Sequence, residues 1–543
     1  MLDTEVLIVG GGPTGLTLAN VLGMHGVRTM LIERNAATVS EPRAVSIDDE
    51  SLRTMQYIGL IDTVRGSIVQ GYGSHYFSPS GKCFAEVMPD TMEYGYARRS
   101  AFRQPILEAQ LRGGLQRFPS VQARFSSNVM RLEAEGNVVR AQVAGPDGSV
   151  DEVSAQYVAA CDGGRSGIRE ALGVKMSGST YGQKWLIVDL IGSTDPFRHT
   201  RVFCDPARPG LALPGPEGTR RYEFMVLPGE SPDELLDEGR VRAMLGRYSE
   251  EDERLPIVRK AIYHFHARIA ERWRTGRIFL AGDAAHLTPP FAGQGMNSGV
   301  RDAHNLGWKM AHCLSGSLGS SALESYESER KPHAWALIQM AVKMGHVMMP
   351  SSRAKSILTQ AAFRALSMYG PARDYVMQMK YKPKPFYEQG LVVGEVGKSM
   401  RGRMFPQPLV ELRDGTRVMF DAVLAKGFAV VEIDDGMLPV AGVRGDRLLA
   451  AKTVRVIPDH HRFLPRKSDE AVQVRDVTGT IGRSFDHAGI RGVILRPDRY
   501  VAACLSRASD ALEADRTLED LVRLSSSALQ ESTQPQNLDL AIA

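Results

Sequence analysis

The chain has 543 residues, too many for one ordinary domain, and a prior of about 150 residues per domain predicts two to four domains. Hydrophobic residues make up 43% of the sequence and charged residues 24%, so the chain can bury a large core and is not intrinsically disordered. The sequence has 66 Lys and Arg and 62 Asp and Glu, a net charge of +4, and its basic residues form no long run. This charge gives no electrostatic basis for binding nucleic acid or an anionic membrane, and a small-molecule partner is favoured.

The cysteines and the first residues predict a cytoplasmic protein that holds no metal. The first residues are acidic where a signal peptide would be basic, and no run of about 18 apolar residues is available to span a bilayer. No CxxC pair and no Cys/His cluster at zinc-ligand spacing occurs among the five cysteines, Cys83, Cys161, Cys204, Cys313 and Cys504.

The first elements form a βαβ pattern. Val6 to Val9 is a short apolar run that ends in the glycine turn 10–15, after which apolar residues recur at helical spacing. Val27 to Ile32 is a second β-rich run that ends at Glu33 and Arg34. We therefore predict a strand, a tight turn, a helix and a second, parallel strand.

Further along the chain, the patterns predict a sheet, long helices and a third unit. Between 176 and 270, apolar and polar residues alternate between Pro/Gly turns, as in an antiparallel sheet. A short buried strand ends at Gly282 and Asp283, and residues 297–350 have a helical period. Pro and Gly in 380–408 predict a linker, after which strands of a smaller α/β domain follow and a polar tail ends the chain.

The glycine turn predicts a dinucleotide site. Gly10, Gly12 and Gly15 form GxGxxG between a strand and a helix, where the backbone can approach a pyrophosphate at the positive helix end. Glu33 can accept hydrogen bonds from an adenosine ribose. A glycine turn without a ligand is the alternative, and the motif alone does not separate NAD from FAD.

A second motif favours FAD. Gly282-Asp283 follows a buried strand and precedes Pro289-Pro290 and the glycine turn 293–297. An Asp at a strand end can hold the ribityl chain of a flavin, and a helix N-terminus can stabilise negative charge on the flavin pyrimidine ring. A plain NAD dehydrogenase has no use for this second site. The alternative is a strand, turn and helix with incidental glycines.

These motifs resemble the fingerprints of the class A flavoprotein monooxygenases, the aromatic hydroxylases of the para-hydroxybenzoate hydroxylase type. The three fingerprints correspond to 10–15, 161–166 and 282–286, with Cys161 standing where a small aliphatic residue is usual. The resemblance covers residues 1–345 and includes Pro42-Arg43-Ala44 and Arg103-Gln104-Pro105, where the family contacts flavin. Within the family, the chain is most similar to hydroxylases of 3-(3-hydroxyphenyl)propionate and related phenols.

The resemblance implies an α/β fold with three parts. A Rossmann-like FAD-binding domain comprises residues 1–175 and 271–345, and an antiparallel sheet domain for the substrate is inserted at 176–270. A helical or linker region follows at 346–399, then a thioredoxin-like C-terminal domain at 400–525 and a flexible tail at 526–543. The lack of CxxC implies that the C-terminal domain serves packing or the formation of a homodimer.

The resemblance also implies a reaction. FAD is reduced by NADH or NADPH as a transient reductant, O2 adds at flavin C4a to give the hydroperoxyflavin, and one oxygen atom is transferred to a phenolic ring. The substrate is a small aromatic molecule such as 3-(3-hydroxyphenyl)propionate.

The site residues follow from the motifs and the resemblance. Arg43 is expected beside a flavin that can move, and Pro290 is expected to aim backbone carbonyls at the ring system; His286 is interpreted as structural. Tyr222 and Arg201 complete the catalytic candidates, and Phe203, Glu223 and His264 are further lining candidates, but alternation alone does not show which face of the sheet they occupy. The predicted cofactor-binding residues are Gly10, Gly12, Pro13, Thr14, Gly15, Glu33, Arg34, Arg43, Arg103, Gln104, Asp162, Gly163, Gly282, Asp283, Pro290, Gly293, Gly295, Met296 and Asn297.

Other functions of the same fold stay open. A flavin-dependent halogenase needs a WxWxIP segment, whereas the four tryptophans here are isolated. An FAD-dependent oxidase or reductase that never transfers oxygen is harder to exclude, because one fold hosts many chemistries. A non-enzymatic flavin-binding role is a further alternative.

Overall fold

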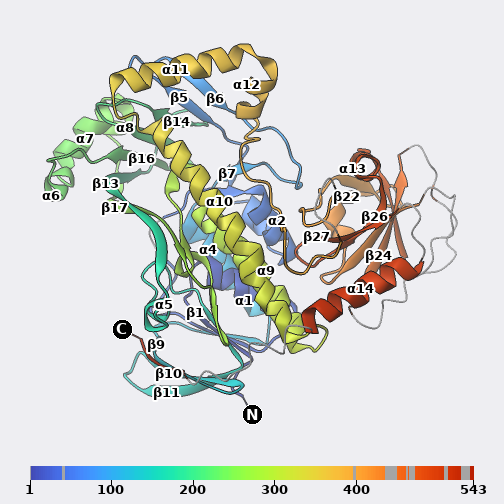
Figure 1. Ribbon diagram of the computed structural model, residues 1–543. Helices are drawn as coiled ribbons and strands as arrows, with labels where there is room; N and C mark the ends of the chain where they lie inside the picture. Colours follow the sequence, from blue (N-terminus) through green and yellow to red (C-terminus); the bar gives the residue numbers. More distant parts are fainter. Residues whose placement is uncertain are drawn as a thin grey trace.

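A six-stranded sheet carries the first glycine turn at the carboxyl end of one of its inner strands (Figure 1). The structure is a computed structural model that describes residues 2–39, 43–394, 399–434, 449, 451–459, 463, 471–506, 511–526 and 538–542. All strands of the sheet are parallel except β18, and their order is β18 (Arg274–Thr275), β19 (Ile278–Leu280), β12 (Tyr157–Ala160), β1 (Val6–Val9), β2 (Thr29–Ile32) and β8 (Val121–Arg124). The predicted βαβ unit is confirmed.

Helices pack on this sheet and begin at the site. α1 (Pro13–Met24) packs against α9 (Gly295–Leu314), and a Cβ at Gly307 would approach Val21 Cγ1 to 2.7 Å, so the two helices need a glycine at their contact. α10 (Ser325–Met348) follows, and together α9 and α10 confirm the predicted helical region. The nearby helices are α2 (Asp49–Tyr57), α3 (Ile61–Arg65), α4 (Gln104–Gly114) and α5 (Gly167–Ala171).

An eight-stranded sheet lies beside the six-stranded one (Figure 1). The range 176–270 contributes its middle strands, but the sheet also takes β5, β6 and β20 from outside that range. The helices α6 (Pro232–Leu235), α7 (Glu238–Gly246) and α8 (Glu250–Glu253) belong to the same region. The strand order is β20 (His286–Leu287), β17 (Ile257–Ala270), β13 (Met176–Leu190), β16 (Arg220–Met225), β15 (Gly210–Pro214), β14 (Thr200–Phe203), β5 (Ser74–Phe77) and β6 (Cys83–Val87).

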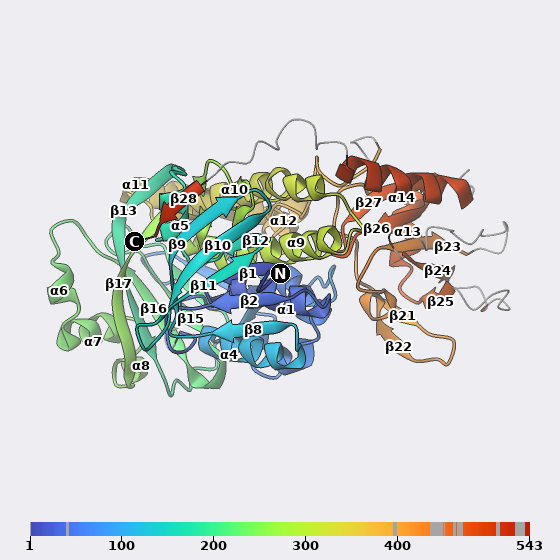
Figure 2. The same cartoon turned by 90° about the horizontal axis from the view of Figure 1, so that it is seen from below.

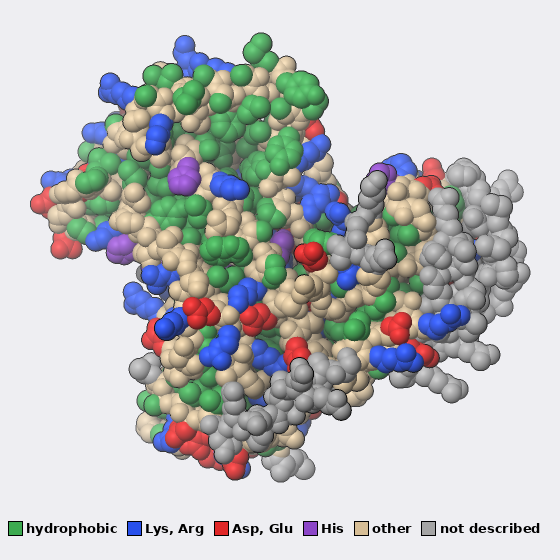
Figure 3. Space-filling view, in the orientation of Figure 1, with side chains coloured by type: hydrophobic (Ala, Val, Ile, Leu, Met, Phe, Trp, Pro, Cys, Tyr) green, Lys and Arg blue, Asp and Glu red, His purple; other side chains and the backbone are tan. Residues whose placement is uncertain are grey.

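Two exposed helices cover the β6 edge of this sheet. α11 (Arg353–Met368) contacts β6 and is followed by α12 (Gly370–Met377). Hydrophobic side chains gather over these helices at the top of Figure 3, where Leu358 is 71% and Met368 88% exposed. Such a patch is unusual for a surface that contacts only water.

Two smaller sheets complete this part of the chain. β3 (Ser46–Asp48), β7 (Arg99–Ala101) and β4 (Val69–Gln70) form one. The other has the order β11 (Val150–Ala155), β10 (Val138–Ala144), β9 (Asn128–Glu135) and β28 (Leu538–Ala541), as Figure 2 shows.

The last strand departs from the predicted flexible tail. β28 pairs antiparallel with β9, placing Leu540 opposite Leu132. Leu540 is only 7% exposed and belongs to the large core around the six-stranded sheet. The tail prediction is therefore wrong for Leu538–Ala541, because burial of one leucine and pairing of the β9 edge fix this segment.

The C-terminal region forms a mixed seven-stranded sheet with its own core. The strand order is β22 (Arg417–Met419), β21 (Leu409–Glu411), β25 (Ala471–Asp476), β24 (Lys452–Pro458), β23 (Ala429–Ile433), β26 (Ile490–Leu495) and β27 (Val501–Ser506), with helices α13 (Thr480–Ala488) and α14 (Ala511–Ser526). A second cluster joins it to Trp308 of α9. Across the described ranges, no helix is long and apolar enough to cross a membrane.

Candidate active site

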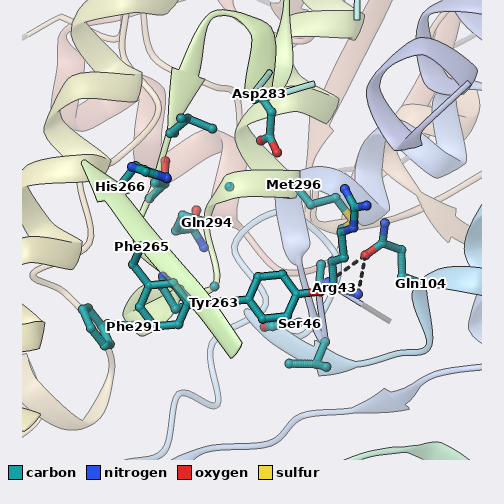
Figure 4. Close-up of a pocket in the computed structure, with 18 of the residues that line it drawn as sticks. Arg43, Ser46, Gln104, Tyr263, Phe265, His266, Asp283, Phe291, Gln294 and Met296 are labelled. Carbon is teal, nitrogen blue, oxygen red and sulfur yellow. Dashed lines mark hydrogen bonds between the residues drawn. The ribbon is translucent and has the colours of Figure 1, made fainter. Parts of the chain in front are cut away.

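A cavity of about 1220 Å³ extends from the first glycine turn to the eight-stranded sheet (Figure 4). Gly12 and Thr14 of the first turn, Asp283 and Met296 of the second motif, and Phe265 of β17 all line it. The structure therefore brings segments that are far apart in the sequence into one site.

The first turn is crowded at two glycines and open at a third. A Cβ at Gly10 would lie 2.3 Å from the Cys161 carbonyl oxygen, and one at Gly15 would lie 2.0 Å from the Gly10 carbonyl oxygen. No atom lies within 4 Å of the Cβ position of Gly12. Since Gly12 is the N-cap of α1 and Pro13 its first residue, the open space lies at the positive end of the helix, where an anionic group fits.

The acidic residue after β2 is held against this turn. Glu33 Oε2 accepts a hydrogen bond from the Gly11 N–H at 2.6 Å, and its Oε1 accepts one from the Asn35 N–H at 2.8 Å. The next residue, Arg34, is exposed and lines the cavity. Of the two predicted residues, Arg34 lines the cavity, whereas Glu33 is buried outside the lining and contacts the first turn from behind.

A glutamine fixes the loop that presents Arg43. Gln104 Oε1 accepts hydrogen bonds from the backbone N–H groups of Arg43 at 2.9 Å and Ala44 at 2.7 Å (Figure 4). The Arg43 carbonyl accepts a further bond from Arg221 at 2.9 Å. With its backbone held in this way, Arg43 leaves its side chain exposed at the cavity wall.

Two other predicted contacts, Arg103 and Asp162, lie outside the cavity lining. Arg103 is outside the lining, and its guanidinium pairs with Glu217 at 2.7 Å. Asp162 is also outside the lining and accepts a hydrogen bond from the Ile168 N–H at 3.3 Å, whereas its neighbour Gly163 does line the cavity. Pro42 lies outside the described residues.

Asp283 directs its carboxylate into the cavity (Figure 4). Among the described residues, this carboxylate has no hydrogen bond or ion pair, and burial raises its pKa above the usual range although His286 and Arg43 oppose the shift. The preceding Gly282 packs against the first turn, because a Cβ there would lie 2.4 Å from Thr14 Oγ1. Asp283 is therefore positioned firmly and is free to bind hydroxyl groups.

The second glycine turn forms the adjoining wall. The lining here includes Pro290, Gly293, Gly295 and Met296. Asn297 is not part of it: its Oδ1 accepts a hydrogen bond from the Asp48 N–H at 3.1 Å, and its Nδ2 donates to the Gly293 carbonyl at 2.7 Å. Asn297 thus fixes the turn from behind, while α9 begins at Gly295 and points its N-terminus at the cavity.

Buried ion pairs support this turn. Arg301 of α9 donates to Gln294 Oε1 at 2.9 Å and to Glu50 Oε2 at 2.5 Å. Lys382, which follows α12, reaches Glu50 at 2.7 Å and Asp48 at 3.0 Å. Since these groups are almost fully buried, their ion pairs hold the second glycine turn in a fixed position.

His286 is structural, as expected. It is fully buried and hydrogen-bonds Asp302 at 2.7 Å through Nε2. Asp302 also accepts hydrogen bonds from the Gly282 N–H at 3.1 Å and from Arg330 at 2.9 Å. The cations beside Asp302 hold the pKa of its carboxyl below the usual range against the effect of burial.

Within the described residues, two groups place three possible metal-ligand atoms within 4.8 Å of one another. The first group is Asp48, Asp49 and Glu50, whose carboxyl groups already form ion pairs with Arg301 and Lys382. The other group is His75, Cys83 and Glu86 on β5 and β6. Neither group lines the cavity.

Two strands of the eight-stranded sheet, β14 and β16, present alternate residues to the cavity. On β16, Arg221 and Glu223 line it, whereas Tyr222 points to the other face and donates its hydroxyl proton to Asp252 at 2.7 Å. On β14, Thr200 and Val202 line it, as does His264 on β17.

Arg201 and Phe203 share the other face with Tyr222. Arg201 pairs with Asp195 at 2.5 Å, and the Phe203 ring lies 4.2 Å from that of Tyr248. The catalytic candidates Tyr222 and Arg201 therefore lie outside the cavity. Successive side chains of a strand point to opposite faces of the sheet, and each candidate stands between two residues that line the cavity.

Glu223 is the lining carboxyl that titrates near neutrality. Burial raises its pKa to about 7, with Arg221 opposing the shift and Asp189 adding to it. A proton can therefore be gained or lost at this position of the cavity at ordinary pH.

Aromatic side chains gather at one end of the cavity (Figure 4). The rings of Phe265 and Phe291 are 5.7 Å apart at 90°, and Trp185 stacks on Phe265 at 5.9 Å. Tyr263 lines the same region. These surfaces suit a planar aromatic molecule.

Comparison with known proteins decides the family. The model of the FAD binding domain matches residues 3–341, and that of the HcaD C-terminal domain matches 402–521. The chain is 40% identical over 512 residues to the 3-(3-hydroxy-phenyl)propionate/3-hydroxycinnamic acid hydroxylase of Burkholderia cenocepacia, covering 92% of this chain and 93% of that one. The chain belongs to the class A flavoprotein monooxygenases.

Further similarities agree with membership among these monooxygenases. The hydroxylase of the same name from Klebsiella pneumoniae is 38% identical over 509 residues, covering 92% of this chain and 91% of that one. The flavin-dependent monooxygenase PieE, solved with FAD and substrate, shares 21% identity at a TM-score of 0.77, covering 96% of this chain and 99% of that one. Aklavinone-11 hydroxylase, solved with FAD and aklavinone, shares 23% identity at a TM-score of 0.77, covering 96% and 99% respectively. At these lower identities the likeness shows a shared fold.

FAD is the cofactor of this flavoprotein monooxygenase, and the site fits it. The space at Gly12 can take a pyrophosphate, the unpaired Asp283 carboxylate can take ribityl hydroxyls, and the N-terminus of α9 faces the same cavity.

Sequence reasoning missed part of this monooxygenase site. Arg99 and Ser74 line the cavity from strands that carry no motif, and Lys382 supports it from a segment interpreted as linker. Phe265 and Phe291 gave no sequence signal beyond ordinary core composition. Only the fold brings these residues together.

Proposed function

We propose that this protein hydroxylates a phenolic aromatic acid of the 3-(3-hydroxyphenyl)propionate class, using FAD, NADH or NADPH, and O2. The names of the relatives at 38–40% identity support this substrate class. The observation that carries the proposal is one cavity lined by the two flavin motifs, by aromatic rings and by basic side chains.

The FAD-holding residues are proposed from their positions. Gly12, Pro13 and the N-terminus of α1 would hold the pyrophosphate, and Glu33 would face the adenosine ribose. Asp283 would hold the ribityl chain, and the turn from Gly293 to Met296 would contact the ring system, where the α9 dipole would stabilise negative charge. When bound, FAD accepts reducing equivalents from the nicotinamide and activates O2.

The remaining cavity residues shape the substrate site. Phe265, Phe291 and Tyr263 hold the aromatic ring and exclude water from it. Pro290 fixes the backbone beside the ring system, and Arg43 lies at the wall where a moving flavin would pass. Glu223, with its pKa of about 7, can exchange a proton with the site.

The C-terminal domain is proposed to be thioredoxin-like. β23 runs parallel to β24 and antiparallel to β26, β26 is antiparallel to β27, and α14 follows β27. This connectivity and order support the proposal. We also propose a homodimer, which the exposed apolar face of α11 and α12 supports and sedimentation would test.

The function is tested by substrate-stimulated turnover of the FAD-loaded protein. We expect 3-(3-hydroxyphenyl)propionate or 3-hydroxycinnamate to accelerate oxidation of NADH or NADPH, with a hydroxylated product detected by mass spectrometry. One product per nicotinamide oxidised supports the proposal. Acceleration with only hydrogen peroxide for every phenolic acid tried would instead indicate an oxidase and contradict it.

A further inference from the structure

Arg99 is a partly buried cation in the cavity wall, with no anionic partner among the described residues. Its Nη1 donates to Ser74 Oγ at 2.7 Å and its Nη2 to the Tyr72 hydroxyl at 3.1 Å, while its guanidinium lies 4.5 Å from the Tyr72 ring centre. Nε is buried without an acceptor. A guanidinium has five N–H donors, so most of them have no partner among the described residues.

The groups that face Arg99 are neutral. The titratable side chains that influence it are Tyr72, Tyr76 and Tyr381, and burial raises the pKa of both Tyr76 and Tyr381. No described carboxylate lies within ion-pair distance of Arg99, although withdrawing a charge even partly from water without an ionic partner is costly. A ligand anion would supply the missing partner.

The other arginines of the lining are already engaged or lie elsewhere. Arg221 and Arg259 share Asp189, at 2.7 and 3.7 Å. Arg34, Arg43 and Arg165 are exposed, and Arg169 donates to the backbone carbonyls of Ala284 and Gly164. Arg268 lies opposite Leu287 of β20, beside the Gly282–His286 motif on the cofactor side.

Arg99 lies in the part of the cavity between the second glycine turn and the eight-stranded sheet, where the substrate is proposed to bind. It lies on β7, which pairs with β3, and Ser46 of β3 lines the cavity next to Gly293 (Figure 4). Its partner Ser74 lies across from Thr200, in a row of lining residues on the sheet. A ligand held by Arg99 would therefore lie between the second glycine turn and the eight-stranded sheet.

We infer that Arg99 binds the carboxylate of the aromatic acid substrate and that Ser74 and Tyr72 orient its guanidinium for this purpose. The inference rests on the proposed function for the identity of the acid. It assigns selectivity for acids over neutral phenols to one residue, since desolvated ion pairs with hydrogen bonds discriminate strongly.

The test compares an aromatic acid that lacks the phenolic hydroxyl with a phenol that lacks the carboxylate, each in the wild type and in the variants. Equilibrium binding of 3-phenylpropionate and of 3-ethylphenol to the FAD-loaded protein is followed by the change in flavin absorption, which needs no turnover. In Arg99→Met we expect binding of the acid to weaken by at least roughly 30-fold, and binding of 3-ethylphenol to stay within about threefold. Arg99→Lys, which keeps the charge, should recover part of the affinity for the acid.

Matched variants separate this role from a structural one. Arg98→Met removes the neighbouring cation, which donates to the Gln378 carbonyl and does not line the cavity, and should leave both affinities unchanged. Equal losses for acid and neutral ligand in Arg99→Met would overturn the inference, as would a selective loss in Arg268→Met alone. Because binding is measured without turnover, absence of hydroxylation in the wild type would count against the proposed function only.

Discussion

At the residue scale, the cavity is a place where charges lack their usual partners. Among the residues that the structure describes, Asp283 presents a carboxylate without a hydrogen bond to the cavity beside the second glycine motif, whereas Arg99 presents a guanidinium without an anionic partner from β7. Glu223 lies in the same cavity with a pKa of about 7. Glu223 is buried, Arg99 is partly buried and Asp283 is exposed to the open cavity, and charged groups that lack ionic partners within the described ranges and converge on one cavity indicate ligand binding.

Glu223 should make binding of an acid depend on pH. Its pKa is raised by burial to about 7, so it is mostly neutral at pH 6 and mostly ionised at pH 8. Ionised Glu223 repels a bound carboxylate, and the dissociation constant of 3-phenylpropionate should therefore rise up to roughly tenfold over this range. Titrations of the protein with 3-phenylpropionate at several pH values, followed by flavin absorption, measure this dissociation constant.

The same titrations contain their controls. Glu223→Gln cannot ionise and should give a nearly flat profile, as should 3-ethylphenol with the wild type. A wild-type profile that is equally flat, or a Glu223→Gln profile that keeps the slope, would contradict the assignment.

At the scale of elements, the sequence patterns predicted those features that are formed within one short segment of the chain. The first turn and its flanking strands lie within one short stretch of chain, so the alternation and glycines of 6–34 suffice to predict them. Which face of a strand lines the cavity is not encoded locally. Tyr222 and Glu223 are adjacent and equally plausible as lining residues, and only the fold shows that Tyr222 bonds Asp252 while Glu223 lines the cavity. Arg99 and β28 depend on partners in remote strands, which no local pattern encodes.

β28 gives a prediction about the sheet that it completes. Leu540→Ala removes a buried side chain opposite Leu132 and should destabilise the pairing by about 2 kcal/mol, which would speed hydrogen exchange of the β9 amides. Ala541→Ser, at an exposed position of the same strand, is the control and should leave exchange unchanged. Unaltered exchange in Leu540→Ala would show that β9 does not depend on β28.

At the scale of the whole molecule, buried ion pairs join the C-terminal domain to the flavin domain. Glu329 of α10 accepts hydrogen bonds from Lys309 of α9 at 2.6 Å and from Arg496, after β26, at 2.7 Å. Arg496 also pairs with Asp498, and all four side chains are buried. The C-terminal domain is thus fixed against α9, the helix whose N-terminus lines the cavity.

Breaking this network should destabilise the whole protein. Glu329→Gln leaves Lys309 and Arg496 as buried cations with reduced compensation, a change that costs about 3–5 kcal/mol and should lower the unfolding midpoint in urea. Limited proteolysis should also cut the C-terminal domain faster. Lys384→Met removes an exposed pair with Glu93 and should change stability by less than about 1 kcal/mol. Equal midpoints for the two variants would refute this role.

The pairing of β28 with β9 also orders events during synthesis. Arg131 and Asp539, which bond across these strands, are 408 positions apart. A ribosome must therefore finish the entire seven-stranded domain before the β9 edge can be covered, and until then that edge is open to other chains. A chain that stops early would keep an uncovered strand at its flavin domain, so aggregation or degradation of such fragments follows from the topology alone.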